Sequence, residues 1–479
     1  MNLSHTYLTL PSQLYRTCPP TAVSAPALLA YNAAFGNDLG LDEHWARSQE
    51  GIDFFAGNAN RDTYASIASA YSGFQFGQYN PQLGDGRALL LGELVTGDGT
   101  AHEIQLKGAG PTPYSRGGDG RSALGPVIRE YLMSEAMHSL GVPTTRALMA
   151  LRTGDTVIRD RLQPGGILVR TAPSHIRFGS FQFAAARHDE EALHALLDLA
   201  FTRHYPMVTA ELRTPQNLLK RVTEATAHLI AKWMSIGFIH GVMNTDNMSI
   251  GGLTLDYGPC AFQDAFSWQR VFSSIDTGGR YRYAQQPNIG LWNLARLAEA
   301  LLPIWPGNES EKIAQAEAIL HTFKPTFEHQ RNALFAAKLG LRNDDTVFQT
   351  TIEPLLNFLE EYSLDFTLSF AHLEALSKGD VERLHLVQSA LEEHEKLESF
   401  WHEGSFEQTQ WQHNVTNPLV IPRNHQIEAA IKSAEQGDNQ DTLRLITLYT
   451  SKSAQQTLTA DDIRGPEPGE WIGRTFCGT

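Results

Sequence analysis

Residue types that bind metal ions lie close together in the middle of the chain. Asp246 and Asn247 are adjacent, and Asp256 follows nine residues after Asn247. Mg²⁺ prefers oxygen ligands, usually one or two carboxylates completed by phosphates and water. Asp246, the other carboxylate of this segment, could accept a proton as a general base. The plainer alternative is that Asp-Asn and Asp-Tyr-Gly each form an ordinary turn.

The order of these residues resembles the catalytic core of a protein kinase, with one change. The kinase catalytic loop reads H-R-D-x-x-x-x-N and is followed by D-F-G. His240, Asn247 and Asp256 match this pattern, but Val242 stands where a kinase has its catalytic Asp. We therefore expect a nucleotide and metal site that does not perform ordinary phosphoryl transfer. Two alternatives stay open, a phosphotransferase that uses Asp246 as a displaced base and a non-catalytic nucleotide-binding scaffold.

An upstream lysine and glutamate fit the same site. Residues 101–107 alternate between apolar and polar side chains, which predicts a half-buried strand that ends at Lys107. Glu130 stands 23 positions later in a predicted helix, with Pro126 in its first turn and Gly141 at its end. The two residues resemble the kinase ion pair that orients the phosphates of ATP. A solvent-facing lysine is the commoner alternative.

Two glycine-rich stretches could hold phosphate groups. Gly84, Gly86 and Arg87 form a turn before the apolar run 88–95, where a kinase phosphate loop would lie. A second stretch, residues 107–121, has no counterpart in ordinary kinases, and its unhindered backbone N–H groups could hold anionic oxygens. A plain hairpin turn and a mobile surface loop are the respective alternatives.

Four arginines are candidate phosphate ligands, because a planar guanidinium binds phosphate through two hydrogen bonds. Arg116 and Arg121 lie in the second glycine-rich stretch. Arg170 ends a predicted strand at 167–170, and Arg177 follows seven residues later. Most arginines are solvated surface residues, so these positions alone do not establish phosphate binding.

Beyond these motifs, the chain resembles the selenoprotein O family of pseudokinases, which act as protein adenylyltransferases. The resemblance extends over nearly the whole chain. The matching segments are residues 75–77, 81–88, 107–121, 134–138, 141–148, 240–258, 286–289 and 292–296.

The resemblance implies an α+β fold with the two lobes of a protein kinase. It also implies a flipped ATP, whose α-phosphate faces the acceptor, so that AMP is transferred to a Ser, Thr or Tyr hydroxyl of a protein substrate and pyrophosphate leaves. By position, Lys107 pairs with Glu130 and contacts phosphate, Asp246 is the base, and Asn247 and Asp256 bind Mg²⁺ or Mn²⁺. The residues implied to line the nucleotide site, besides Lys107 and Asp256, are Gly84, Gly86, Arg87, Asp119, Gly120, Arg170 and Arg177.

The three cysteines bear on location and regulation. So few cysteines, without a C-x-x-C pair, indicate a reducing compartment and no structural zinc, so we expect a cytoplasmic protein. Cys477 occupies the position, third from the C-terminus, where some family members carry selenocysteine. One hypothesis is a reversible disulfide that regulates substrate access, with Cys260 as the candidate partner. The alternative is an idle terminal thiol.

Composition limits the other classes of partner. The 479 residues carry a net charge of −15, which argues against a general binder of nucleic acid or of anionic membranes. No stretch approaches the roughly 20 apolar residues of a membrane span, and the N-terminus does not read as a secretory signal. The oligomeric state is left open.

The patterning predicts four regions. They are an N-terminal extension at 1–82, loop-rich to residue 36 and then helical, a mixed α/β N-lobe at 83–180, a mostly helical C-lobe at 181–410, and a C-terminal extension at 411–479. The strand signals fall mainly in the second region. Later in the chain, helices are expected over residues 190–236, including 225–236, and at 291–302, 352–362 and 427–435.

Overall fold

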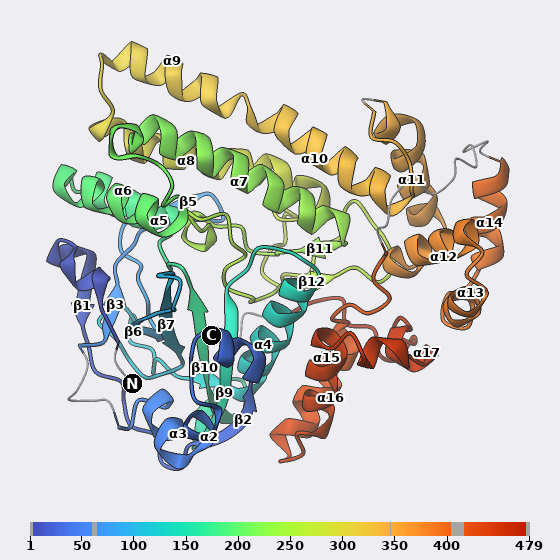
Figure 1. Ribbon diagram of the computed structural model, residues 1–479, viewed down its shortest axis with the longest axis horizontal. Coiled ribbons are helices and arrows are strands. Elements are labelled where there is room, and N and C mark those ends of the chain that lie inside the picture. The colour runs from blue at the N-terminus through green and yellow to red at the C-terminus, as the bar shows by residue number, and fades with distance from the viewer. Residues whose placement is uncertain (1–2, 60–64, 345, 404–415, 476–479) are drawn as a thin grey trace.

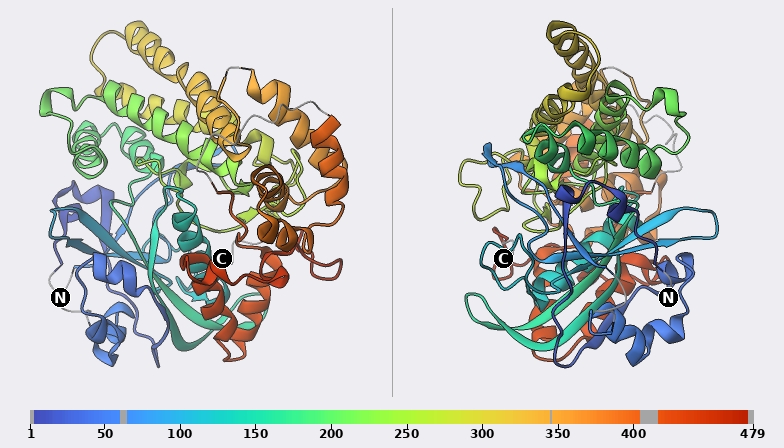
Figure 2. Two further views of the ribbon diagram at one scale, coloured as in Figure 1. Left: turned by 45° about the vertical axis from the view of Figure 1, so that its right-hand side comes forward. Right: turned by 90° about the vertical axis from the view of Figure 1, so that its left-hand side faces the viewer.

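The computed structural model describes residues 3–59, 65–344, 346–403 and 416–475. One half is built on an antiparallel sheet and the other on packed helices (Figure 1), and two turned views keep this arrangement (Figure 2). Within the described residues the main sheet has the order β1-β3-β6-β7-β10-β9-β2, with β8 paired to β10. The predicted α+β class is confirmed.

The main sheet and two small sheets of two strands each contain all named strands of the described residues. The strands of the main sheet are β1 (Tyr15–Thr17), β2 (Ala27–Tyr31), β3 (Ile67–Ser69), β6 (Ala88–Val95), β7 (Ala101–Lys107), β8 (Ser122–Ala123), β9 (Arg146–Ile158) and β10 (Leu162–Ala172). The small sheets are the hairpin of β4 (Gly73–Gln75) with β5 (Gln78–Asn80), and the pair of β11 (Phe238–Ile239) with β12 (Ala261–Phe262).

Helices cover the sheet and build the other half. They are α1 (Ala33–Asp38), α2 (Glu43–Arg47), α3 (Gln49–Phe55), α4 (Leu124–Ser139), α5 (Phe178–Ala185), α6 (Glu190–His204), α7 (Pro215–Ser235), α8 (Gln286–Leu301), α9 (Glu309–Leu320), α10 (Phe323–Lys338), α11 (Glu353–Glu361), α12 (Phe366–Lys378), α13 (Val381–Gln388), α14 (His394–Glu403), α15 (Asn424–Glu435), α16 (Gln440–Thr450) and α17 (Ala460–Ile463). Among the residues described, no helix is both long and apolar enough to cross a membrane.

Strand β7 has the predicted bounds, but the prediction that it is half-buried is wrong. Ile104 and Leu106 are fully buried on one face, and Glu103 and Gln105 on the other face are only 2% and 1% exposed. Burying such polar groups is costly unless they find partners. Both do, as described below, so the polar face of β7 belongs to the interior of a site.

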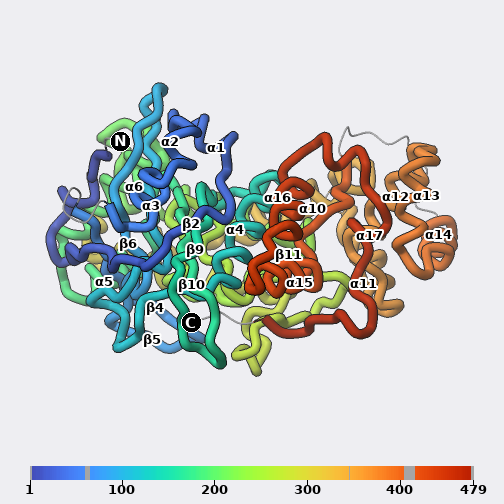
Figure 3. The backbone as a smooth tube through the Cα atoms, turned by 90° about the horizontal axis from the view of Figure 1, so that it is seen from below, coloured from blue at the N-terminus to red at the C-terminus, as the bar shows by residue number. Residues whose placement is uncertain are grey.

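Helix α4 lies between the sheet and the C-terminal helices (Figure 3). Nearly all of its residues from Leu124 to Met137 are buried, as expected of a helix packed on both sides. Arg129 on its outer side donates a hydrogen bond to Asn424 at 3.0 Å and forms an ion pair with Glu428, both in α15. The C-terminal segment therefore holds the helix that carries Glu130.

The N-terminal segment contributes strands that the sequence did not indicate. β1 and β2 lie in the part expected to be loop-rich, and they pair with β3 and β9 at the two ends of the sheet. Strands of three to five residues carry too few positions for an alternating pattern to stand out. The segment 1–82 is thus joined to the sheet by backbone hydrogen bonds, in addition to its helices α1–α3.

Candidate active site

Lys107 and Glu130 meet where β7 ends against α4. The lysine Nζ lies 2.6 Å from Glu130 Oε2, and both side chains are largely buried, at 13% and 6% exposure. The same Nζ lies 2.7 Å from Asp256 Oδ1. The structure therefore brings together the strand lysine, the helix glutamate and the aspartate of Asp-Tyr-Gly.

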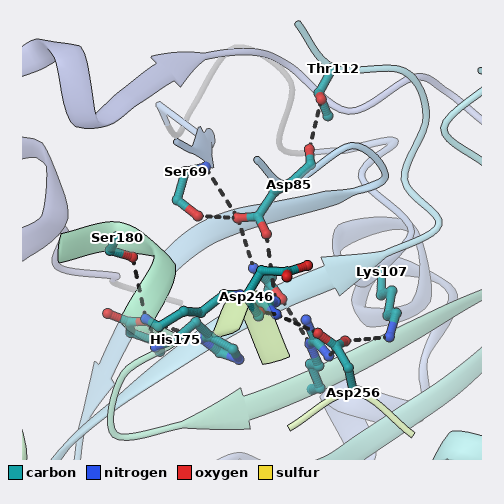
Figure 4. A network of polar contacts seen from close by, with 12 residues as sticks. Ser69, Asp85, Lys107, Thr112, His175, Ser180, Asp246 and Asp256 are labelled. Carbon is teal, nitrogen blue, oxygen red and sulfur yellow. Dashed lines mark hydrogen bonds and ion pairs between the residues drawn. The ribbon is translucent and has the colours of Figure 1, made fainter. Parts of the chain in front are cut away.

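Asp256 is the centre on which three cations converge (Figure 4). Besides Lys107, Arg170 Nη1 lies 2.6 Å from its Oδ1, and Arg177 Nη1 lies 2.5 Å from its Oδ2. Burial alone would raise the pKa of Asp256, but the three cations outweigh burial and hold that pKa well below its usual range. Its backbone has φ +64°, an uncommon conformation for a residue with a Cβ, which directs the carboxylate into the cluster.

The two arginines are fixed from several sides. Arg170, 2% exposed, also donates to Gln105 Oε1 at 2.7 Å and to Glu130 Oε1 at 2.9 Å. Arg177, equally buried, donates to the backbone oxygen of Asp246 at 2.6 Å. The alternative of solvated surface arginines is thereby wrong for both.

Asp85 is a buried carboxylate that the sequence reading missed. It is 3% exposed, accepts hydrogen bonds from the Ser69 backbone N–H at 3.1 Å and from Gln105 Nε2 at 3.3 Å, and lies 3.9 Å from Arg177 Nη2. Its position between Gly84 and Gly86 was the available signal, since a carboxylate flanked by glycines can approach neighbouring backbone closely.

A second missed pair lies deeper on β7. Glu103 accepts hydrogen bonds from the backbone N–H of His175 at 2.8 Å and lies 2.9 Å from its Nδ1. Burial raises the pKa of Glu103 to about 8 and lowers the pKa of His175 well below its usual value. Burial thus favours the neutral form of both groups, and their hydrogen bonds anchor the segment that leads to Arg177.

Asp246 lies in a short 3₁₀ turn, Thr245–Asn247, beside this cluster. It is 7% exposed, and its Oδ2 accepts a hydrogen bond from Gln75 Nε2 at 3.0 Å. Within the described part of the chain its Oδ1 is buried without a hydrogen-bond partner. Burial raises the pKa of Asp246 to about 6, so the carboxyl is held in a state suited to exchanging a proton near neutral pH.

The predicted metal ligands differ in their surroundings. The pKa of the Asp256 carboxyl is held well below its usual range by the three cations, whereas Asn247 donates from its Nδ2 to Val242 O at 3.0 Å, so that a metal would have to contact its Oδ1. The described residues contain no group of three or more acidic, histidine or cysteine side chains able to hold a metal alone. One carboxylate and one amide fit Mg²⁺ or Mn²⁺ only when phosphates and water complete the shell.

The two glycine-rich stretches pack against each other. Gly84 has φ +138°, and a Cβ there would lie 2.4 Å from Cγ of Tyr114 in the second stretch. Thr112 Oγ1 donates to the backbone oxygen of Asp85 at 2.7 Å, and Ser115 Oγ donates to that of Gly86. The second glycine-rich stretch therefore packs directly on the first.

The other residues predicted to line the nucleotide site or to bind phosphate contact parts of the chain outside the Asp256 cluster. Asp119 is exposed and pairs with Arg159 at 2.8 Å, and Arg121 donates to backbone oxygens of the N-terminal segment. Gly120 has φ +64° and closes the loop with its backbone oxygen on Gly110 N at 3.1 Å. Arg87 is partly exposed, and its carbonyl accepts from Gly108 N at 2.7 Å.

The C-terminal end approaches the segment that follows Asp256. Thr475 Oγ1 donates to Pro259 O at 2.7 Å, and its backbone N–H donates to Phe272 O at 2.7 Å. The neighbouring Cys260 is fully buried. Cys477 lies outside the described residues, so the disulfide between the two stays a prediction.

Comparison with known proteins places this site in a family. A sequence model described as "Protein adenylyltransferase SelO" matches residues 1–450. Relatives called "Protein nucleotidyltransferase YdiU" include those of Methylorubrum populi, 47% identical over 99% of this chain and 98% of the relative, and Bradyrhizobium diazoefficiens, 44% identical over the same shares. A third, from Halalkalibacterium halodurans, is 46% identical over 99% of this chain and 96% of its own. The chain therefore belongs to the SelO family of protein adenylyltransferases.

Proposed function

We propose that this nucleotidyltransferase uses the cluster around Asp256 to bind ATP in flipped orientation and transfers AMP to a Ser, Thr or Tyr hydroxyl of a protein substrate. One observation carries the proposal. Lys107, Arg170 and Arg177 converge on Asp256, and Asp246, whose backbone oxygen accepts a hydrogen bond from Arg177 at 2.6 Å, is joined to the same cluster. Cations suited to a triphosphate and a carboxylate suited to a base therefore occupy one site.

The architecture is proposed to be that of a two-lobed kinase. Residues 83–180, with the sheet and α4, would form the N-lobe, and residues 181–410, with α5–α14, the C-lobe. Segments 1–82 and 411–479 would be extensions that brace the N-lobe. In support, β7 and α4 supply Lys107 and Glu130 from one half, while Asp246 and Asp256 come from loops near the other half.

The depth of the cations supports the flipped nucleotide. Arg170 and Arg177 are almost fully buried, whereas the Lys107 side chain is 13% exposed. A triphosphate whose terminal groups contact the arginines would leave its α-phosphate nearer the opening, towards an acceptor. Gly84, Gly86, Arg87, Asp119 and Gly120 are proposed to line the rest of the nucleotide.

Asp256 and Asn247 would hold Mg²⁺ or Mn²⁺ together with the phosphates. The metal would neutralise charge on the phosphates as it builds up in the transition state. The three cations now paired with Asp256 would turn to the incoming phosphate oxygens, which offer the same charge-assisted hydrogen bonds. Glu130 would keep Lys107 and Arg170 in place during this exchange.

Transfer itself is a single displacement. The acceptor hydroxyl oxygen bonds to the α-phosphorus while the bond from that phosphorus to the bridging oxygen of the pyrophosphate breaks. The Asp246 carboxylate accepts the hydroxyl proton, and the arginines stabilise the pyrophosphate that leaves.

The protein is proposed to act in the cytoplasm. It has few cysteines, and Cys260 is buried, as is typical of proteins in a reducing compartment.

Asp246→Asn is expected to lower the turnover number by about 10²–10⁴-fold while ATP affinity changes little. The amide keeps the shape but cannot take a proton. Because burial raises the Asp246 pKa to about 6, parent activity should fall tenfold per pH unit below about pH 6, where the base becomes protonated. Steady-state kinetics from pH 5 to 8 measure both effects.

Asp198→Asn is a matched control, since Asp198 is exposed on α6. Normal turnover with weakened ATP binding in Asp246→Asn would show that Asp246 is a ligand and not the base.

Arg177→Ala and Arg170→Ala are each expected to weaken ATP binding by roughly 10–100-fold, because a charge-assisted hydrogen bond contributes about 1.5–3 kcal/mol. AMP binding should change by less than about threefold if the arginines hold the terminal phosphates. Calorimetric titration with both nucleotides checks this. Arg146→Ala is the control, because Arg146 pairs with buried Glu135 outside the site. Equal losses for ATP and AMP contradict the flipped placement.

The function is tested by intact mass measurement after incubation with ATP, Mg²⁺ or Mn²⁺ and a mixture of acceptor proteins. An adduct with the mass of AMP is the expected product. A phosphate adduct would favour a phosphotransferase with a displaced base, and unchanged masses would favour a nucleotide-binding scaffold.

A further inference from the structure

The hairpin β4–β5 runs along the loop that carries Asp246. Three successive residues of this hairpin bond to the loop. The Phe74 N–H donates to Thr245 Oγ1 at 2.8 Å, Gln75 Nε2 to Asp246 Oδ2 at 3.0 Å, and the Phe76 N–H to Asn244 Oδ1 at 3.1 Å. Phe74 and Phe76 are thus the sequence neighbours of Gln75, whose side chain contacts the proposed base.

Each of these two Phe rings contacts an aromatic ring from the later, mainly helical part of the chain. Phe74 contacts Trp292 of α8 with ring centroids 5.3 Å apart, and Phe76 contacts Tyr281 at 5.2 Å. Figure 1 shows β5 between the main sheet and α8. Phe74, Phe76 and Trp292 are partly exposed, so an aromatic surface begins one residue from Gln75.

Two arginines lie on this surface. The Arg280 guanidinium carbon is 4.8 Å from the Trp292 ring centroid and 5.7 Å from that of Tyr281. Arg296 lies 5.3 Å from Trp292 and 5.8 Å from Phe74. A guanidinium at these distances is attracted by the π face of the ring, and its N–H groups can still donate to a ligand. We call the set Phe74, Phe76, Arg280, Trp292 and Arg296 the arginine–aromatic surface; Tyr281, 1% exposed, lies beneath it.

The two arginines differ in their carboxylate partners. Arg296 forms an ion pair with Glu299 at 2.6 Å, with side chains 28% and 54% exposed. Such an exposed pair contributes only about 0–1 kcal/mol, so a carboxylate of a bound ligand can replace Glu299. Among the described residues Arg280 forms no ion pair with a carboxylate, and the nearby Asp276 accepts the backbone N–H groups of Arg280 and Tyr281.

From this placement we infer that the arginine–aromatic surface binds the acceptor segment of the protein substrate, and that it selects Asp or Glu side chains close to the acceptor hydroxyl. The inference rests on the proposed function, because it takes Asp246 as the base. Arg and aromatic residues are enriched at protein interfaces. The Asp or Glu side chains of the bound segment would pair with the guanidiniums of Arg280 and Arg296, while the acceptor hydroxyl of the same segment reaches Asp246. The arginines proposed for the triphosphate, Arg170 and Arg177, are buried and separate from this surface.

The test measures binding and not transfer. Two fluorescein-labelled peptides are compared by anisotropy, one with a Tyr flanked by Glu residues and one with Gln in place of each Glu. The parent is expected to bind the Glu peptide about tenfold more tightly, and the double variant Arg280→Gln with Arg296→Gln should lose this preference. Arg331→Gln is the control, since Arg331 also stacks on an aromatic ring, 3.4 Å from the Phe348 centroid, but on α10.

Several results would overturn the inference. They are equal binding of both peptides by the parent, a preference that survives in the double variant, and a preference equally lost in Arg331→Gln. Single-stranded DNA that binds the parent as tightly as the Glu peptide would show a general anion site instead. Peptide binding is measured without ATP, so a failure to transfer AMP would defeat the proposed function while leaving the peptide preference readable.

Discussion

Asp256→Asn is expected to abolish metal-dependent AMP transfer, with a loss on the order of 10³-fold or more. The Asp256 carboxylate is the one ionised ligand proposed for the metal, and the neutral Asn247 amide cannot replace its charge. Activity assays and calorimetric titration with ATP, each with and without Mg²⁺ or Mn²⁺, measure the effect. ATP binding in the variant should become independent of the metal, and unchanged metal dependence would refute the assignment.

The same substitution should destabilise the free protein. Three cations would face one another without their shared carboxylate, and removing one partner of a buried ion pair costs about 3–5 kcal/mol. Because the pKa of Asp256 is held well below its ordinary value of 3.8, this contribution is present above about pH 4 and is lost as pH falls through the folded-state pKa. Urea unfolding at pH 7 and at pH 3 should show a large difference between parent and variant that shrinks in acid.

Lys107→Ala is expected to reduce transfer by about 10²–10³-fold, the usual loss when one stabilising donor to a reacting group is removed. The fold should survive, because Glu130 keeps Arg170 as a partner at 2.9 Å and Asp256 keeps both arginines. Initial rates together with thermal melting measure the two properties. Lys220→Ala is the matched control, since Lys220 is exposed on α7.

A folded, fully active Lys107→Ala variant would contradict the assignment of Lys107 to phosphate. Loss of both activity and fold would show that the lysine is needed for the structure.

The elements that carry the site were predictable because their signals are local. The alternation over residues 101–107 gives β7 with its exact bounds, and Pro126 with Gly141 brackets α4 to within two residues at each end. Residues 190–236 were predicted to be helical, and α6 and α7 lie there, but α7 begins at Pro215, ten residues before the stretch 225–236 that was singled out. Thr214 caps it and Pro215 suits its first position, so the boundary signal was present but lay outside the stretch with the clearest apolar pattern.

The partners of the site residues were less predictable, since they come from distant parts of the chain. Gln105 reaches Arg170 across 65 positions, and Glu103 reaches His175 across 72. An alternating strand reveals that polar side chains share one face, but it does not reveal whether water or another element covers that face. The burial of the polar face of β7 therefore appears only when β10 and the segment after it are in place.

The transfer of AMP from ATP to protein is tested most directly by following each phosphate of ATP separately. The parent is incubated with acceptor proteins and ATP labelled with ³²P at either the α- or the γ-phosphate, and the labelled proteins and released products are separated. A flipped nucleotide beside Asp246 predicts that the α-label enters protein, that the γ-label leaves as pyrophosphate, and that Asp246→Asn slows both together. Transfer of the γ-label to protein would contradict AMP transfer.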